Sequence, residues 1–301
     1  MINRFTKSEA LKYGLYVIAV LPVFIFRDFT LDNELRYLSI ADEALSNGSI
    51  FTFTNHGIPY ADKPPLYLWI VMLGKLLFGN HNMLFLGIFS FAPALVILYT
   101  MDKWVKSFLS GSERLLGQLM LITIGYFLGA ALVLRMDMLM CMFIVLSLYT
   151  FFRMYSGAGK RWDSILFPIF VFMALFSKGP VGIIIPLVST LVFLIVKGEI
   201  KSMGKYWGWK TLGVLLTLCG AWFTGVYAEG GSQYLDNLLF NQTFNRAVDS
   251  FHHKEPIYYY LMTIWYSLAP WSLLYAGILI MGLKMKLVTT DIERFFLVVI
   301  Q

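Results

Sequence analysis

The sequence contains few charged residues and few cysteines for its length. Asp, Glu, Lys and Arg make up 14% of its 301 residues, whereas hydrophobic residues make up 58%. With a mean hydropathy of +0.68, the chain has too few polar side chains to cover a water-soluble globule of this size. The composition therefore excludes a soluble globular protein and indicates an integral membrane protein.

Other features are missing as well. The two cysteines, Cys141 and Cys219, both fall inside long apolar runs, where a thiol is most simply a small apolar group. The sequence therefore predicts neither a disulfide nor a cysteine-based metal site. The first apolar run is followed by no small-residue cleavage site, so we interpret it as a retained anchor rather than a signal peptide. The predicted cytoplasmic segments contain no Gly-rich phosphate-binding loop.

The apolar runs predict an all-α, polytopic bundle of transmembrane helices, since a bilayer core requires about 20 apolar residues per crossing. The predicted crossings are 11–27, 82–101, 115–134, 138–152, 164–177, 180–196, 211–228 and 257–283. A ninth apolar run begins at Arg294, and the sequence stops a few residues later at Gln301. We therefore expect the native reading frame to continue into further crossings.

The basic residues predict the orientation of the bundle. With the N-terminus in the cytoplasm, most of the 24 Lys and Arg residues lie on the cytoplasmic side, as the positive-inside rule requires. The net charge of +6 then reflects membrane insertion, and it supports no nucleic-acid partner. The remaining charges gather on the outer side, in the loops 28–81 and 229–256 and in two tight turns. The positive-inside rule does not explain these outer charges, so we look for a functional role for them.

The first outer loop is predicted to hold two interfacial helices. Over residues 33–47, apolar side chains recur at helical spacing, with the acidic residues off that face. These apolar residues are Leu35, Leu38, Ala41 and Leu45. A second helix, apolar nearly all round, is predicted over 65–79. Together the two helices would bring the segment 32–37 close to Asp62 and Lys63.

Lys63 is the central candidate of this loop. Because it precedes Pro64, it is pushed out of the helical region, and Pro65 suits the first turn of the following helix. The ammonium is therefore expected at a helix start, where free N–H groups and the helix dipole favour an anion such as a phosphate. The aromatic run that follows indicates a membrane interface, so the anion would be a lipid headgroup. The alternative is a solvated ion pair in a proline-rich loop.

Other outer residues also have two interpretations. Asp32 is placed to cap the helix that follows it or to act in catalysis. Arg135 and Asp137 lie between two apolar runs, where such a pair either closes a turn or marks a functional cavity. Lys178, in the turn 177–180, is by itself ordinarily a solvated lysine.

The last outer loop carries Arg246 and His253, followed by tyrosines at the membrane entry. His253 could join Asp62 as a metal ligand, since a carboxylate with an imidazole suits zinc with open positions. An interfacial histidine without a ligand is the alternative, because a metal usually needs a further ligand nearby.

Five short motifs, taken in order, resemble those of the membrane glycosyltransferases of the GT-C superfamily. The closest groups are the protein O-mannosyltransferase-like enzymes and the aminoarabinose transferase of lipid A. The motifs are Asn33–Tyr37, Tyr60–Pro64, Arg135–Asp137, Ser177–Pro180 and His253–Pro256. The resemblance implies transfer of a sugar from a polyprenyl-phosphate carrier to a lipid, glycan or protein acceptor. The reaction would take place at the periplasmic face of a bacterial inner membrane, as in lipid A modification of the cell envelope.

The resemblance also assigns roles and a domain. Residues 1–301 would be the N-terminal part of the transmembrane catalytic domain, which in known members continues into further crossings and an outer soluble domain. The implied carrier-phosphate ligands are Arg36, Lys63, Arg135, Lys178 and Arg246. The implied carrier or sugar contacts are Tyr37, Tyr60 and Tyr259. The implied catalytic residues are Asp32, Glu34 and Asp137. The implied ligands of a divalent metal (zinc, magnesium or manganese) are Asp62 and His253.

One position departs from the family pattern. An ungapped match puts Asn33 on the family's catalytic aspartate, with Asp32 one residue early and Glu34 in place. Asparagine cannot act as a general base, so either Asp32 replaces it or another carboxylate serves. In the expected mechanism Lys63 stabilises the leaving phosphate, and a carboxylate takes the proton of the attacking hydroxyl.

Two other functions stay open. A secondary transporter or lipid flippase would place its binding charges near the bilayer midplane, whereas the predicted crossings are nearly free of charge. An inactive carrier-binding homologue is the other alternative, because Asn33 stands where the family has its aspartate.

Overall fold

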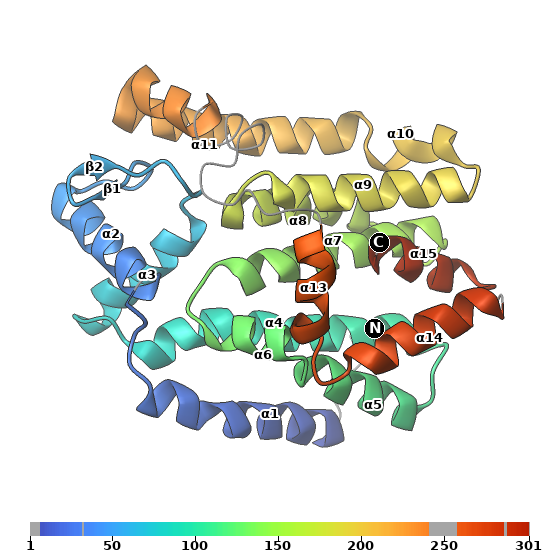
Figure 1. Ribbon diagram of the computed structural model, residues 1–301. Helices are drawn as coiled ribbons and strands as arrows, with labels where there is room; N and C mark the ends of the chain where they lie inside the picture. Colours follow the sequence, from blue (N-terminus) through green and yellow to red (C-terminus); the bar gives the residue numbers. More distant parts are fainter. Residues whose placement is uncertain (1–6, 32, 241–257, 286–287, 301) are drawn as a thin grey trace.

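The computed structural model describes residues 7–31, 33–240, 258–285 and 288–300. Within these ranges the chain is almost entirely helical, as predicted (Figure 1). The helices are α1 (Lys7–Phe26), α2 (Glu34–Asn47), α3 (Leu66–Phe78), α4 (Met83–Val105), α5 (Gly111–Ile122), α6 (Gly125–Leu132), α7 (Asp137–Tyr155), α8 (Asp163–Lys178), α9 (Val181–Val196), α10 (Met203–Tyr206), α11 (Trp209–Asp236), α13 (Tyr258–Ser267), α14 (Ser272–Lys284) and α15 (Asp291–Ile300), with a 3-10 turn η1 at Ile200–Ser202. Two short antiparallel strands, β1 (Thr54–Asn55) and β2 (Ile58–Pro59), pair Thr54 with Pro59.

The helices differ in their length and hydropathy. In the described ranges, α1, α4, α7 and α11 are long and apolar enough to cross a membrane, and α5 with α6, bent by 66° at a short break, would make a fifth crossing. Helices α8 and α9 have 16 residues each, about 24 Å of helix, which is short of the ~30 Å hydrocarbon core. Both lie alongside α7 (Figure 1). The structure thus supports four or five of the eight predicted crossings by length alone.

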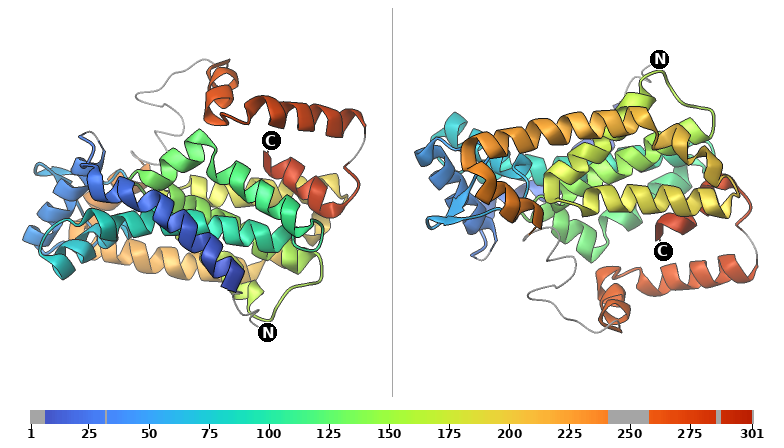
Figure 2. Two further views of the ribbon diagram at one scale, coloured as in Figure 1. Left: turned by 90° about the horizontal axis from the view of Figure 1, so that it is seen from below. Right: turned by 90° about the horizontal axis from the view of Figure 1, so that it is seen from above.

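The single crossing predicted over 257–283 was wrong in its described part. Helices α13 and α14 are separate, and Figure 2 shows them at a large angle to each other beside the bundle. Pro270 lies between them and has no backbone N–H to continue a helical hydrogen-bond ladder. The apolar run continues through Pro270, so hydropathy alone did not reveal the break.

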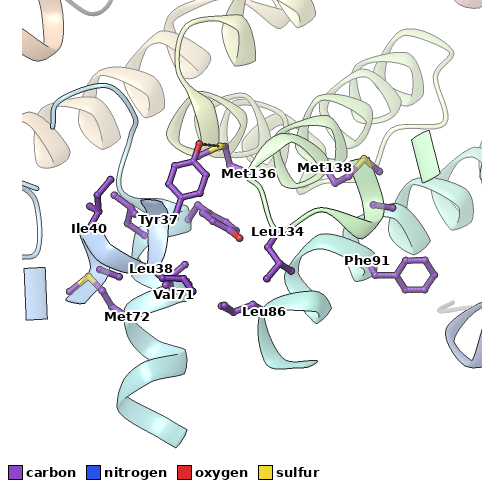
Figure 3. Packing of buried hydrophobic residues seen from close by; sticks show 14 of the residues in the cluster. Tyr37, Leu38, Ile40, Val71, Met72, Leu86, Phe91, Leu134, Met136 and Met138 are labelled. Atoms are coloured by element: carbon purple, nitrogen blue, oxygen red, sulfur yellow. Dashed lines mark hydrogen bonds between the residues drawn. The ribbon is translucent and has the colours of Figure 1, made fainter. Parts of the chain in front are cut away.

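Helices α2 and α3 pack onto the end of the bundle that we call the site end. Tyr37, Ile40 and Ala41 of α2 are at most 2% exposed, and this face meets α3, α4 and the link between α6 and α7 (Figure 3). The predicted apolar face was partly wrong, because Leu35 is 39% exposed whereas Glu34 is buried. An ion pair, described below, turns Glu34 inward.

A second aromatic core joins α7, α8 and α9. The rings of Phe151 and Phe193 contact each other edge-on, and Phe295 of α15 packs against both. Lys197 Nζ lies 2.7 Å from an Asp291 carboxylate oxygen, at the start of α15. Helix α15 therefore begins three residues before the predicted Arg294 and lies against α9.

The turn between α8 and α9 is shaped by two glycines. A Cβ on Gly182 would lie 2.2 Å from the Ala174 carbonyl carbon, so the close contact of the two helices requires glycine there. Gly179 has a φ of +117°, a conformation that only glycine adopts readily. These glycines set the course of the chain directly after Lys178, the last residue of α8.

Candidate active site

The loop that carries Asp62 and Lys63 is fastened to α11 by Glu229. The Glu229 carboxylate accepts hydrogen bonds from the backbone N–H groups of three consecutive residues, Ile50, Phe51 and Thr52, at 2.9 to 3.2 Å. It also accepts the Thr52 hydroxyl proton at 2.6 Å. Sequence reasoning missed this residue, because a lone acid after an apolar run does not reveal backbone partners almost 180 residues away.

Further contacts fix the same loop. The Tyr234 hydroxyl donates to the Tyr60 carbonyl oxygen at 2.7 Å and accepts from the Phe53 N–H at 3.1 Å. Ala61 is 1% exposed and belongs to the apolar cluster that contains Trp222 of α11. Helix α11 therefore positions the residues on either side of Asp62 and Lys63.

Asp137 joins the other two site segments. It is the first residue of α7, and its Oδ1 atom accepts a short hydrogen bond from the Lys178 ammonium at the end of α8. Its Oδ2 atom lies 3.2 Å from Arg135 Nε without the geometry of a hydrogen bond. The structure thus brings together Arg135, Asp137 and Lys178, which the sequence offered only as two separate turns.

Lys63 lies beside this group. Its ammonium is 3.3 Å from Asp62 Oδ2, and the Tyr60 hydroxyl donates to the same oxygen at 3.2 Å. Burial lowers the pKa of Lys63 below its usual value, and the nearby cations Lys178 and Arg36 lower it further. Burial is the main cause of this shift, and the neighbouring cations add to it, so an anion bound beside Lys63 would favour its charged form.

Two cavities, each of about 390 Å³, flank the Asp137–Lys178 pair. One lies between the 61–64 loop, the α8–α9 turn and α11, with Lys63 and Lys178 beside apolar groups such as Trp222 and Ile184. The other lies between α6, the start of α7 and α13, and it is lined by Asp137, Arg135 and Tyr266 among others. The charged group is therefore reached from two sides, and the wall of the first cavity is mainly apolar.

Glu34 has a different environment from Asp137. Its side chain is buried and accepts four hydrogen bonds, two from Arg27 at 2.7 and 2.8 Å and one each from the Thr30 and Leu134 N–H groups. Burial raises the pKa of Glu34, but these bonds outweigh it and hold the pKa below its usual value. Each oxygen is thus already shared by two donors, which leaves little capacity to take a substrate proton.

We therefore propose a positioning role for Glu34 in place of the catalytic role predicted from sequence. Its carboxylate joins Arg27, just after α1, to the α6–α7 link, which contains Arg135 and leads into Asp137 at the start of α7. The sequence offered Arg27 only as the residue that ends an apolar run, so the pair could not be recognised.

Removing the Glu34 carboxylate is expected to destabilise the fold. Glu34→Ala leaves the guanidinium of Arg27 and two N–H groups without their acceptor, which costs about 3 kcal/mol. Thermal unfolding in detergent would show a clearly lowered midpoint. Glu113→Gln, a change at an exposed helix cap, should shift the midpoint far less, and equal shifts for the two variants would contradict the assignment.

The predicted tyrosine contacts differ in their exposure. Tyr37 is 2% exposed, with its ring edge-on to Tyr67 at 5.6 Å and its hydroxyl 3.6 Å from Met136 Sδ (Figure 3). A carrier or sugar contact at Tyr37 therefore does not fit this structure, because core side chains surround the ring on all sides. Tyr259 is 40% exposed on α13. Asp32, Arg246 and His253 lie outside the described residues.

The chain is an all-α polytopic bundle with a charged group at one end that is reached from two cavities. Comparison with solved structures shows that this bundle has the membrane GT-C fold. ArnT from Cupriavidus metallidurans, in a crystal structure with bound undecaprenyl phosphate, superimposes with a TM-score of 0.79 at 18% identity, over 96% of this chain and 53% of that one. At that identity the likeness shows the fold.

The sequence comparison gives the family. A model of the family described as dolichyl-phosphate-mannose-protein mannosyltransferase matches residues 62–223, more than half of the chain, so the chain belongs to this family. The match begins at Asp62 and includes Lys63, Arg135, Asp137 and Lys178.

Full-length relatives extend the comparison. An uncharacterized protein of Aquifex aeolicus is 27% identical over 286 residues, covering 90% of this chain and 55% of that protein. The undecaprenyl phosphate-alpha-4-amino-4-deoxy-L-arabinose arabinosyl transferase of Edwardsiella ictaluri is 26% identical over 276 residues, covering 90% and 49%. The chain thus spans about half the length of the curated relatives it matches.

Proposed function

We propose that this chain forms the donor-binding and catalytic part of a glycosyltransferase. The enzyme would move a sugar from a polyprenyl-phosphate carrier to a lipid or glycan acceptor. The observation that carries the proposal is the first cavity, in which Lys63 and Lys178 stand beside an apolar wall. A phosphate fits the cations and a prenyl chain fits the wall, and the names of the relatives agree with such a donor.

The proposed chemistry uses the residues in place. The bond between the sugar and the carrier phosphate breaks, and negative charge develops on the phosphate near Lys63 and Lys178, which stabilise it together with Arg36 and Arg135. The acceptor hydroxyl attacks the sugar carbon, and its proton passes to a carboxylate.

Asp137 is the carboxylate that fits this proton transfer. Its Oδ2 atom lies 3.2 Å from Arg135 Nε but accepts no hydrogen bond from the described part of the chain, so of the two oxygens it is the one with capacity for a proton. Lys178 on Oδ1 fixes the orientation of the group. The second cavity, which Asp137 lines, would receive the acceptor.

The proposed topology follows from charge. The site end would face the periplasm, with the N-terminus in the cytoplasm, in accordance with the positive-inside rule. In the described ranges, no crossing helix carries a charged residue at its middle. A transporter or flippase would concentrate its polar groups there, so a glycosyltransferase accounts better for the charges at the site end.

The proposed function is tested by comparing cells with and without the gene. Mass spectrometry of carrier lipids and surface glycans should show a polyprenyl-phosphate sugar accumulating and one glycan or lipid modification lost. The wild-type gene should restore both, and the Lys63→Ala gene should not. Unchanged carrier lipids, or restoration by Lys63→Ala, would favour a transporter or an inactive carrier-binding homologue.

Binding of the carrier phosphate should depend on pH through Lys63. The pKa of Lys63 is lowered in the free protein. Binding of phosphate raises this pKa, because the phosphate binds the charged ammonium better than the neutral amine. The affinity should therefore fall as the pH rises through the lowered pKa, at a lower pH than for an ordinary lysine. Titration of the protein with polyprenyl phosphate across alkaline pH checks this, and Lys63→Met should abolish that part of the dependence. An unchanged pH profile in Lys63→Met would contradict it.

A divalent metal at Asp62 stays a proposal, because its predicted partner His253 lies outside the described residues. Within those residues no group of three potential ligands is found. Asp62 Oδ2 faces the Lys63 ammonium and the Tyr60 hydroxyl, and we assign a metal no step in the proposed chemistry. If an ion does bind there, a chelator should lower transfer and added Zn²⁺ or Mn²⁺ should restore it. Unchanged transfer after chelation would rule the site out.

A further inference from the structure

A cavity of about 530 Å³ lies at the end of the bundle opposite the candidate active site. Figure 1 shows this end where α10 and the start of α11 meet the ends of α7 and α9. The cavity lies between the loop that joins α7 to α8 and the segment 204–211. It shares no lining residue with the two cavities at the site end.

Three lysines line this cavity: Lys160, Lys205 and Lys210. All three are exposed, and none forms an ion pair within the described ranges. The carboxylate nearest in sequence to Lys160, that of Asp163, is taken by Arg153 at 2.7 Å and by the Lys160 N–H at 2.8 Å. The lysines therefore present positive charge that the protein itself does not neutralise.

The shape of the cavity depends on a close contact between the backbone at Gly208 and the backbone at Gly204. A Cβ on Gly208 would lie 2.1 Å from the Gly204 carbonyl oxygen, so this contact excludes any side chain at position 208. Gly157 and Gly159 line the opposite side. The result is a basic hollow with little side-chain filling, large enough for a small headgroup.

The hollow also opens next to an aromatic residue. Trp209 is 87% exposed at the start of α11, a helix long and apolar enough to cross the membrane. An exposed indole at the end of a crossing helix is typical of the membrane interface. The lysines are thus placed at the depth of lipid headgroups rather than out in the aqueous phase.

We propose that this cavity binds the phosphate of an anionic phospholipid headgroup. Lys160, Lys205 and Lys210 surround the phosphate, and Trp209 contacts the lipid beside it. Basic pockets between transmembrane helices on the cytoplasmic side bind such headgroups, and the proposed topology puts this cavity on that side. The inference does not depend on the glycosyltransferase function, because it uses no residue of the candidate active site.

Native mass spectrometry of the purified protein tests the proposal. The probes are phosphatidylglycerol and the zwitterionic phosphatidylethanolamine with the same acyl chains. The wild type should retain one phosphatidylglycerol more tightly than phosphatidylethanolamine. The triple variant K160Q/K205Q/K210Q should bind phosphatidylglycerol at least about tenfold more weakly, since each lysine near a membrane surface contributes to anionic-lipid attraction.

A matched control variant distinguishes binding at this cavity from a general effect of the protein's positive charge. K103Q/K201Q/K284Q removes the same charge from residues outside the cavity and should keep wild-type binding. Equal loss in both triple variants, or no loss in the cavity variant, would overturn the proposal. K210Q alone, with an unchanged melting temperature, should show a smaller loss of the same kind.

Two further binding experiments distinguish a lipid headgroup from a soluble phosphate as the ligand. Displacement of phosphatidylglycerol by millimolar glycerol phosphate supports recognition of the headgroup. Inorganic phosphate that binds lipid-free protein as tightly as the lipid does would overturn the lipid assignment and leave a site for a soluble anion.

Discussion

Lys63→Ala is expected to reduce sugar transfer by a factor on the order of 100 or more, as for one charge contact to a transition state in a partly dry site. The loop around Lys63 is held by the prolines that follow it and by the contacts of Glu229 and Tyr234. The variant should therefore insert and express normally, and its binding of the polyprenyl-phosphate carrier should weaken in parallel. Transfer by the complete protein in vesicles, at matched expression, measures the effect.

Two further variants make this result specific. Lys63→Arg should recover part of the activity at best, because a planar guanidinium does not replace a compact ammonium at a crowded phosphate. Lys75→Ala changes a lysine on α3 whose ammonium pairs with Asp42 at 3.3 Å, away from the cavities of the site end, and it should transfer at close to the parental rate. Parental activity of Lys63→Ala would instead mean that Lys63 is only a solvated loop lysine.

Asp137→Asn is expected to lower kcat by a factor on the order of 100 to 10,000, the contribution of a general base. The amide keeps the shape of the side chain but cannot accept the proton of the acceptor hydroxyl. The KM for the donor should change much less, because the cations Lys63, Lys178 and Arg135 remain. Steady-state kinetics with donor and acceptor varied separately would show this split.

A purely structural Asp137 predicts another outcome. If the carboxylate only held Lys178 and Arg135, then Asp137→Asn would raise the KM for the donor and leave kcat close to parental. Asp102→Asn serves as the control. Asp102 also pairs with an arginine, Arg114, at 2.8 Å, but it lies near the C-terminal end of α4, outside both cavities of the site end. That variant should change neither constant.

The backbone from Lys63 into α3 was predictable because its determinants are local. Lys63 is placed by the prolines that follow it, and α3 begins at Leu66, directly after Pro65, as the sequence suggested. The turn at Lys178 was equally readable from its glycine and proline. In each case adjacent residues decide the local backbone, whereas the contacts of Glu229 and Tyr234 with the preceding residues had no local signal.

The errors arose where distant residues decide the outcome. Glu34 was assigned to a polar face, but Arg27 and the Leu134 N–H draw it into the core. Helix α2 also buries Tyr37, which the family resemblance placed at the substrate. Charge pairs and backbone N–H donors that join separate segments have no local pattern, so periodicity assigned the wrong exposure to Glu34.

The pairing of Asp137 with Lys178 also depends on distance in the chain. The sequence placed both residues on the outer side, and the packing of α7 against α8 brings them into contact. Their association could be expected only from the family resemblance. No sequence argument could show that Oδ1 accepts a hydrogen bond from Lys178 whereas Oδ2 faces Arg135 without one.

The hydrogen bonds that Glu229 accepts from three successive N–H groups couple residues 50–52 directly to α11. Trp222 and Phe223 of the same helix line the first cavity. A tilt of α11 within the bilayer would therefore change the width of this cavity and the position of the loop that carries Lys63 together. Lateral pressure or thinning of the membrane that tilts this helix would thus act on the candidate active site as a mechanical input.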